Sequence, residues 1–392
     1  MKRIVTLIVS VLAAAALILV SGLRNKFFDS KVYWGAVRYW FHDGGMVYDW
    51  LQRDTPYGFT YPPFAGLVMS PMAVLPFVLV VVLASIGTVV TTGLLVWWLA
   101  GPVLSRMKQP LWLTFGVAWC VALAFEPVRE TFTFGQVNTL LLTCVTADML
   151  FGVARGKWWA GAGIGLATAI KLTPGVFILY LLVTRRWREA GTAIGAAGAA
   201  TVLAGALFPD QSREFWTSAL WDTNRVGSLW FLSNQSERGM LARFPFDAVE
   251  SQVWIVCVLA TLGFWAWRVT RSRDDVLGGL ALTGILGCLI SPVTWIHHCV
   301  WLIPALIRCV ERFWTAGDRR PAYLAVAAYV LMSSHLTWAW ENRPQPPLAF
   351  LGSNIYVWFG LALLIWTPVG TRSPVAVGEP ERVLAPDLGK LV

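Results

Sequence analysis

The chain has 392 residues, of which 57% are hydrophobic and only 14% are charged, and its formal net charge is +9. This composition excludes a soluble globular domain, because apolar runs near the ~20 residues needed to cross a bilayer recur along the chain. We therefore predict an all-α polytopic membrane protein. The six cysteines lie in apolar segments without C-x-x-C spacing, which predicts neither a metal cluster nor a disulfide framework.

The first apolar segment, residues 4–23, is predicted to be an uncleaved membrane span. Lys2 and Arg3 precede it as in a signal peptide, but Arg24 and Lys26 follow where a cleavage site would need small residues. The hydrophobic runs predict about twelve transmembrane helices in all, near residues 4–23, 64–100, 111–126, 136–154, 158–171, 173–184, 189–208, 252–268, 276–293, 298–314, 321–339 and 353–369.

Two of these stretches are predicted to be broken. Residues 64–100 are long for one span and contain Pro71 and Pro76, which favours a broken or re-entrant piece followed by a full helix. Residues 158–184 are short for two spans, and Lys171 interrupts them. We expect a hairpin of half-helices there, because basic clusters at both of its ends favour the cytoplasm.

The charges predict an orientation for the whole chain. If both termini are cytoplasmic, Lys and Arg outnumber Asp and Glu on the inner segments, as the positive-inside rule requires. Net basicity then reflects orientation and anionic lipid, and no nucleic-acid partner is expected. The histidines and most other polar residues fall at outer span ends. We therefore expect a multi-pass protein of the cell membrane with its site facing the periplasm or outside, where nucleotide sugars are absent.

Six short motifs in and beside the outer segments point to a family. They are Asp29–Ser30–Lys31–Val32–Tyr33, Val47–Tyr48–Asp49, Phe59–Thr60–Tyr61–Pro62–Pro63–Phe64, Phe134–Gly135–Gln136–Val137–Asn138, Ile170–Lys171–Leu172–Thr173–Pro174 and Ser233–Asn234–Gln235–Ser236. In this order they resemble glycosyltransferase family 87, whose members are polytopic enzymes of the GT-C architecture. The likeness extends from Asp29 to about Trp366.

The resemblance implies a polyprenyl phosphate mannose donor and a phosphatidylinositol mannoside glycolipid acceptor, joined through an α-1,2 linkage. Because a lipid phosphate is a good leaving group, the transfer needs a base for the acceptor hydroxyl and cations for the phosphate. In the family the base is the aspartate at the end of the first span, and Asp29 has that position. Attack opposite a β-linked donor would give the α product by inversion. The alternative for Asp29 is a solvated helix cap.

Three further residues are candidates for the same site. Lys171 interrupts an apolar hairpin, where a buried ammonium needs an anion such as lipid phosphate, unless its stem carries the charge to the interface. His297 and His298 point about 100° apart on a helix, so they are poorly placed to bind one metal together. One of them could face the site while the other bonds between helices, or both could be structural.

Other polar residues at the outer face are predicted to contact substrate. They are Glu126, Arg129, Glu130, Asn234, Arg225, Glu341 and Arg343. Glu126 and Glu130 could instead form an internal ion pair with Arg129, and each remaining arginine could be a surface charge of a loop.

No cofactor and no metal are predicted, because the donor carries a single phosphate and the chain lacks a D-x-D pair. Two other functions stay open. One is arabinofuranosyl transfer from polyprenyl phosphate by the same architecture, and the other is lipid or sugar transport, which broken helices would also suit. We expect one catalytic transmembrane domain over residues 1–370 and a disordered cytoplasmic tail over 371–392.

Overall fold

The computed structural model describes residues 1–222, 225, 227–244, 250–341 and 347–370. This part of the chain is helical, and its only β pairings are two isolated bridges, Leu51 with Gly58 and Asn234 with Trp295. The α-helices are α1 (Lys2–Asn25), α2 (Phe28–Phe41), α3 (Pro63–Val68), α4 (Phe77–Leu104), α5 (Leu111–Ala124), α6 (Glu126–Phe134), α7 (Asn138–Ala147), α8 (Ala162–Ile170), α9 (Val176–Val183), α10 (Trp187–Leu207), α11 (Pro209–Glu214), α12 (Glu237–Ala242), α13 (Glu250–Arg271), α14 (Val276–Ile290), α15 (Ile303–Ala316), α16 (Arg319–Ser333), α17 (Pro347–Ser353) and α18 (Ile355–Trp366).

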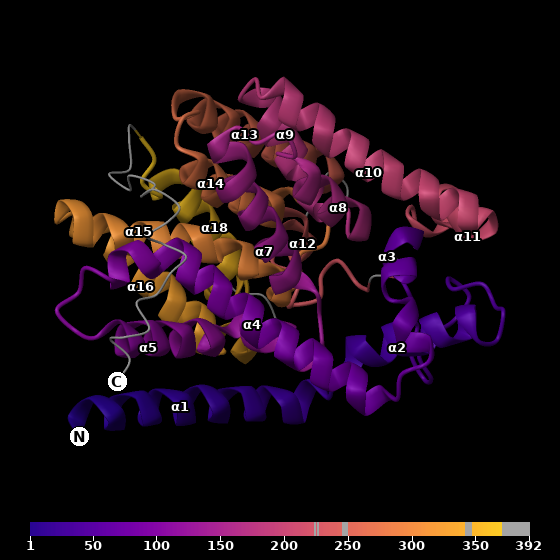
Figure 1. Ribbon diagram of the computed structural model, residues 1–392, viewed down its shortest axis with the longest axis horizontal. Helices are drawn as coiled ribbons and strands as arrows, with labels where there is room; N and C mark the ends of the chain where they lie inside the picture. The colour runs from indigo at the N-terminus through magenta and orange to yellow at the C-terminus, as the bar shows by residue number, and fades with distance from the viewer. Residues whose placement is uncertain (223–224, 226, 245–249, 342–346, 371–392) are drawn as a thin grey trace.

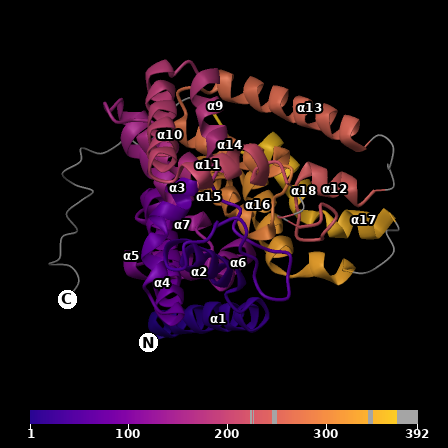
Figure 2. The ribbon, with the colours of Figure 1, turned by 90° about the vertical axis from the view of Figure 1, so that its right-hand side faces the viewer.

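Short helices of other types connect several of these. Four 3₁₀ helices matter below: η1 (Ser70–Ala73), η4 (Thr173–Gly175), η7 (Ile296–Leu302) and η8 (Leu336–Trp340). Figure 1 shows α1 along one edge of the molecule and α10 along the opposite edge, with α2, α3 and α11 gathered at one end. The view turned by 90° places α13 beside the α10 edge, again far from α1 (Figure 2).

Several helices are long and apolar enough to cross a membrane. Within the described residues four qualify, α1, α4, α10 and α13, and a fifth is obtained if α5 and α6, which meet at a bend of 69°, are counted as one span. Shorter apolar helices are Thr173–Val183, α14 and α18. Apolar side chains of α1 such as Leu12 and Val20 are more than 60% exposed, which is expected of a helix that faces lipid. The chain is therefore a multi-pass membrane protein, although helix length alone gives fewer spans than twelve.

The two stretches that the sequence predicted to be broken are broken. Short helices α3 and η1 precede the full-length α4, and Pro76 lies directly before its first residue. Between α8 and α9 the chain leaves the helix at Lys171, whose backbone is extended, and re-enters through η4. The small residues of α8 and α10 allow those two helices to pack closely, with Ala190 and Ala193 fully buried.

Two apolar cores hold the structure together. The larger one is built around α14, which is buried over nearly all of its length, together with α7, α9, α15, α16 and α18. The smaller one joins α2, the loop over residues 47–61 and α3. Val137 and Ile170 pack against both cores. Their neighbours Gln136 and Lys171 consequently lie where the two cores meet.

Candidate active site

A cavity of about 580 Å³ opens at this junction. Its lining comes from segments far apart in the sequence: the start of α2, the 57–62 loop, the residues after α6 and α8, and η7 with the residues before it. It brings together Asp29, Lys171, Arg225, His297 and His298, all of which the sequence predicted as site residues.

Asp29 lies in the first turn of α2, a few residues after α1 ends. Lys26 and Phe27 have left-handed backbone conformations, with φ of 50° and 54°, and they turn the chain sharply between the two helices. The Phe27 N–H donates to the Thr133 carbonyl at 2.8 Å, and Ser30 Oγ donates to the Gly135 carbonyl at 3.3 Å. The turn that carries Asp29 is thus held on both sides by the end of α6.

Gly135 is required for this contact. Its φ is +73°, and a Cβ atom at this position would lie 1.8 Å from Ser30 Oγ. Any L-residue here would meet both a backbone strain and a collision with the turn beside Asp29.

A chain of hydrogen bonds orients the Asp29 carboxylate. Gln136 Nε2 donates to Asp29 Oδ2 at 2.7 Å, and Gln136 Oε1 accepts from the Tyr61 hydroxyl at 2.8 Å. The Tyr61 hydroxyl in turn lies 3.0 Å from that of Tyr33. Among the described residues Oδ1 has no partner, so one oxygen is fixed and the other is available to a ligand.

The surroundings also change the acidity of Asp29. Burial raises its pKa to about 6, while the Gln136 hydrogen bond and the charge of Lys171 oppose that increase. A carboxylate of this kind is ionised at neutral pH and is a stronger base than an exposed aspartate. This is the property that a general base needs.

Lys171 is 8% exposed, and its ammonium reaches into the same space. Nζ lies 2.9 Å from Asn138 Oδ1 and 3.0 Å from His298 Nε2, and it stands 5.2 Å from the centre of the Tyr61 ring. No carboxylate is bonded to it among the described residues. The cavity therefore contains a buried cation without a protein counter-ion at bonding distance, which favours an anionic ligand.

Both histidines line the cavity, which differs from the expectation that only one would face it. Their rings are 4.7 Å apart at 82° because they are consecutive in η7. His298 Nε2 lies 3.0 Å from Lys171 Nζ and, in the tautomer with the ring proton on Nδ1, accepts a hydrogen bond from the ammonium. Neither ring nitrogen of His297 has a partner among the described residues, although the ring is only 5% exposed. His297 is thus available to hydrogen-bond a ligand.

The acidic residues predicted in α6 are committed to the fold instead. Glu126 Oε2 accepts from the Tyr356 hydroxyl at 2.6 Å, and its Oε1 bonds His335 Nδ1. Glu130 pairs with Arg24 at 2.7 Å. Both carboxylates are buried and neither lines the cavity. They tie α1, α6, η8 and α18 together, so the expectation that they contact substrate is not supported by the geometry.

The remaining predicted contacts are also outside the cavity or outside the described residues. Arg129 donates to a backbone carbonyl of α16 at 3.3 Å, and Asn234 accepts from the Thr294 N–H at 2.9 Å while bonding other backbone groups. These side chains therefore support the surrounding backbone. Glu341 is exposed at the end of η8 and does not line the cavity. Arg343 lies outside the described residues.

Arg225 completes the cationic side of the cavity. Its Nη1 donates to the Tyr48 carbonyl at 2.6 Å, and its Nε lies 3.4 Å from Asp222. The structure also shows three residues whose roles the sequence did not suggest, Gln136, Asn138 and Tyr61. They lie in the motifs at residues 134–138 and 59–64, so the motifs themselves were the signal that could have found them.

The fold and the cavity define a class of protein: a multi-pass membrane protein with a carboxylate, a buried lysine and histidines around one cavity. The sequence model of glycosyltransferase family 87 matches residues 59–292, and the chain belongs to this family. Asp29, His297 and His298 lie beyond the two ends of that match. No solved structure matches the chain significantly.

Several characterised proteins are similar over most of their length. A polyprenol-phosphate-mannose-dependent α-(1-2)-phosphatidylinositol mannoside mannosyltransferase of Mycobacterium tuberculosis is 31% identical, covering 86% of this chain and 83% of its own. The corresponding pentamannoside mannosyltransferase of Mycolicibacterium smegmatis is 35% identical, with 77% and 73% covered. An α-(1->3)-arabinofuranosyltransferase of Corynebacterium glutamicum is 23% identical, with 75% and 69% covered.

Proposed function

We propose that the protein transfers mannose from polyprenyl phosphate mannose to a phosphatidylinositol mannoside glycolipid, forming an α-1,2 linkage with inversion. The observation that supports this most strongly is that one cavity is lined by the oriented carboxylate of Asp29, the buried Lys171 and His297, whose ring nitrogens have no partner among the described residues. The named activities of the mannosyltransferase relatives supply the donor and acceptor.

In the proposed reaction Asp29 Oδ1 removes the proton of the acceptor hydroxyl. The hydroxyl oxygen forms a bond to the anomeric carbon as the bond from that carbon to the phosphate oxygen breaks, and polyprenyl phosphate leaves. Lys171, with Arg225, neutralises the charge that develops on the phosphate. His297 donates a hydrogen bond to the phosphate or to a sugar hydroxyl, and His298 holds the Lys171 ammonium in place.

The second candidate function is arabinofuranosyl transfer. A similar arabinofuranosyltransferase favours it, but its identity to this chain is lower than that of the mannosyltransferases. The two donors share the lipid phosphate, so Asp29 and Lys171 would act alike on both. Transport is disfavoured because the similar proteins named above are sugar transferases.

The same proposal includes the architecture. We assign the chain to the GT-C fold with about twelve spans, adding the bent α5–α6 pair and helices α7, α8, α9, α14, α15, α16 and α18 to the four long apolar helices. The cavity lies at the α2 end of the molecule, opposite the basic α4–α5 loop, so we place it on the periplasmic face. The catalytic domain is residues 1–370, and the predicted tail 371–392 lies outside the described residues.

The test is transfer of radiolabelled mannose from synthetic polyprenyl phosphate mannose to a phosphatidylinositol mannoside. Asp29→Asn should lower the rate by roughly 100-fold or more, because it removes the base. Asp43→Asn is the matched control, since Asp43 is exposed in the same outer region. Full activity of a folded Asp29→Asn protein would disprove the role of Asp29. Transfer of arabinose but not mannose would disprove the donor.

A further inference from the structure

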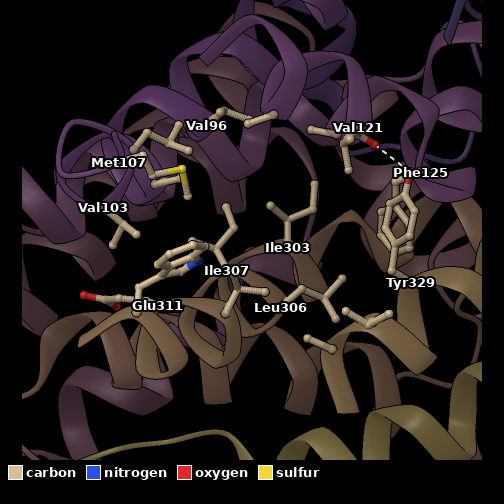
Figure 3. A pocket seen from close by; sticks show the side chains of 18 residues that line it. Val96, Val103, Met107, Val121, Phe125, Ile303, Leu306, Ile307, Glu311 and Tyr329 are labelled. Atoms are coloured by element: carbon tan, nitrogen blue, oxygen red, sulfur yellow. Dashed lines mark hydrogen bonds between the residues drawn. The ribbon is translucent and has the colours of Figure 1, made fainter. Parts of the chain in front are cut away.

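A second cavity, of about 320 Å³, lies between two helix pairs far from Asp29. One wall is formed by α4 and α5 and the other by α15 and α16 (Figure 3). Its lining side chains are almost all apolar, and they include Val96, Val103, Ile303, Leu306 and Ile307. Glu311 is the one charged residue of the lining.

The cavity is closed at one end. The Tyr329 hydroxyl donates to the Val121 carbonyl at 2.9 Å, and the Tyr329 ring stacks on Phe125 with centroids 5.6 Å apart (Figure 3). From this end the lining follows α15 from Ile303 to Trp314, which is ~16 Å at the rise of an α-helix. One leaflet of a bilayer has a hydrocarbon thickness of roughly 15 Å. The cavity therefore has the length of a single lipid chain.

The cavity is also open along its side. Val121, Val310, Trp314 and Val326 line it and are between 37% and 56% exposed. An apolar cavity of this kind does not hold water, and an empty one forfeits dispersion contacts along its walls. Hydrocarbon from the surrounding membrane suits both its surface and its shape.

Positive charge surrounds the other end. Met107 lines the cavity, and its neighbours Arg106 and Lys108 in the α4–α5 loop are exposed, without a side-chain partner among the described residues. The Glu311 carboxylate is paired with Arg308 at 3.0 Å, so it does not cancel these charges.

We propose that this cavity binds one chain of an anionic phospholipid of the cytoplasmic leaflet, with the phosphate headgroup held by Arg106 and Lys108. The choice of the cytoplasmic leaflet rests on the topology in the proposed function. The site is separate from the sugar-transfer cavity, with which it shares no lining residue. Its ligand is a constituent of the membrane rather than a substrate.

Native mass spectrometry of the purified full-length protein tests this, after exchange into detergent with phosphatidylglycerol or phosphatidylcholine of identical chains. We expect the wild type to retain one phosphatidylglycerol, preferred over phosphatidylcholine by roughly tenfold or more. Ala118→Phe, which fills the cavity, should lose both lipids. Arg106→Gln with Lys108→Gln should retain a lipid but lose the preference.

The control pair is Arg155→Gln with Lys157→Gln, which removes two exposed charges from another loop and should leave the preference unchanged. Equal retention of the two lipids by the wild type, unchanged retention in Ala118→Phe, or an unchanged preference for phosphatidylglycerol in the Arg106 and Lys108 double variant would each overturn the proposal. A wild-type protein that forms a dimer and retains no lipid would also overturn the proposal. Because no sugar transfer is measured, the result is independent of the proposed catalytic function.

Discussion

Replacing Gln136 by Leu tests whether the Gln136 hydrogen bond lowers the pKa of Asp29, the proposed base. Gln136 donates the 2.7 Å hydrogen bond to Asp29 Oδ2, and this bond stabilises the ionised carboxylate. A hydrogen bond to a charged group contributes about 1.5 to 3 kcal/mol, and 1.4 kcal/mol corresponds to about one pKa unit. Without the bond, the pKa of Asp29 should rise from about 6 to roughly 7 to 8.

The sign of the pH dependence follows from the proposed role of Asp29 as the base. A base must be ionised, so transfer decreases as the pH falls through its pKa. At pH 6.5 Gln136→Leu should be slower than wild type by roughly eightfold, and at pH 8.5 the two rates should nearly agree. The assay is kcat/KM for mannose transfer between pH 5 and 9, because this ratio reports the free enzyme.

The control is Tyr33→Phe, which removes a hydroxyl three hydrogen bonds away from Asp29 and should leave the acidic inflection in place. A Gln136→Leu protein whose rate is reduced equally at every pH would refute the reasoning. Gln136 would then support the fold without adjusting the base. A pH profile of Gln136→Leu whose acidic inflection remains near pH 6 would also refute the reasoning.

Three further outcomes are expected. Lys171→Met should raise the KM for the donor roughly tenfold or more and change the KM for the acceptor little, because the cation proposed to bind the donor phosphate is lost. Equal increases in the two KM values would contradict a contact between Lys171 and the phosphate. Chelators should leave transfer intact, because the proposed donor carries a single phosphate that Lys171 and Arg225 can neutralise. Loss of activity on chelation that one metal restores would contradict this. Glu126→Ala should cost about 1 to 3 kcal/mol of unfolding free energy, seen as lower thermal stability, because it removes the acceptor of the His335 and Tyr356 hydrogen bonds, of which Tyr356 keeps a second acceptor in the Met332 carbonyl.

The sequence was informative where a charge interrupts an apolar run. Lys171 stands out because ionised groups are rare inside apolar spans, and Asp29 stands out because the family has its base at the end of the first span; the structure places both in one cavity. Glu126 gives the same signal, yet its partners His335 and Tyr356 are more than 200 residues away. No local pattern encodes that distant pairing. A structural acid and a catalytic acid therefore look alike until the helices are assembled.

Neutral residues were harder to interpret for a different reason. Gln136 and Asn138 are amides next to helix ends, where such residues usually satisfy backbone groups. Here each bonds an ionised side chain supplied by another helix, Asp29 in one case and Lys171 in the other. The breaks at residues 64–76 and at Lys171 were predictable from proline and charge. The 69° bend between α5 and α6 was not, because it depends on how α6 packs against α1 and η7.

Gly135 has a consequence for how this protein tolerates change. A substitution there would push Ser30 and with it the turn that presents Asp29, although position 135 contributes no side chain to any reaction. In a saturation screen that selects for sugar transfer, position 135 should be as intolerant as position 29. Variation should be freer at exposed Gly191 in α10, where the backbone is helical and a new Cβ meets no neighbour. The screen would then show that the position of Asp29 depends on a glycine more than a hundred residues away in the sequence, at which no other residue is accepted.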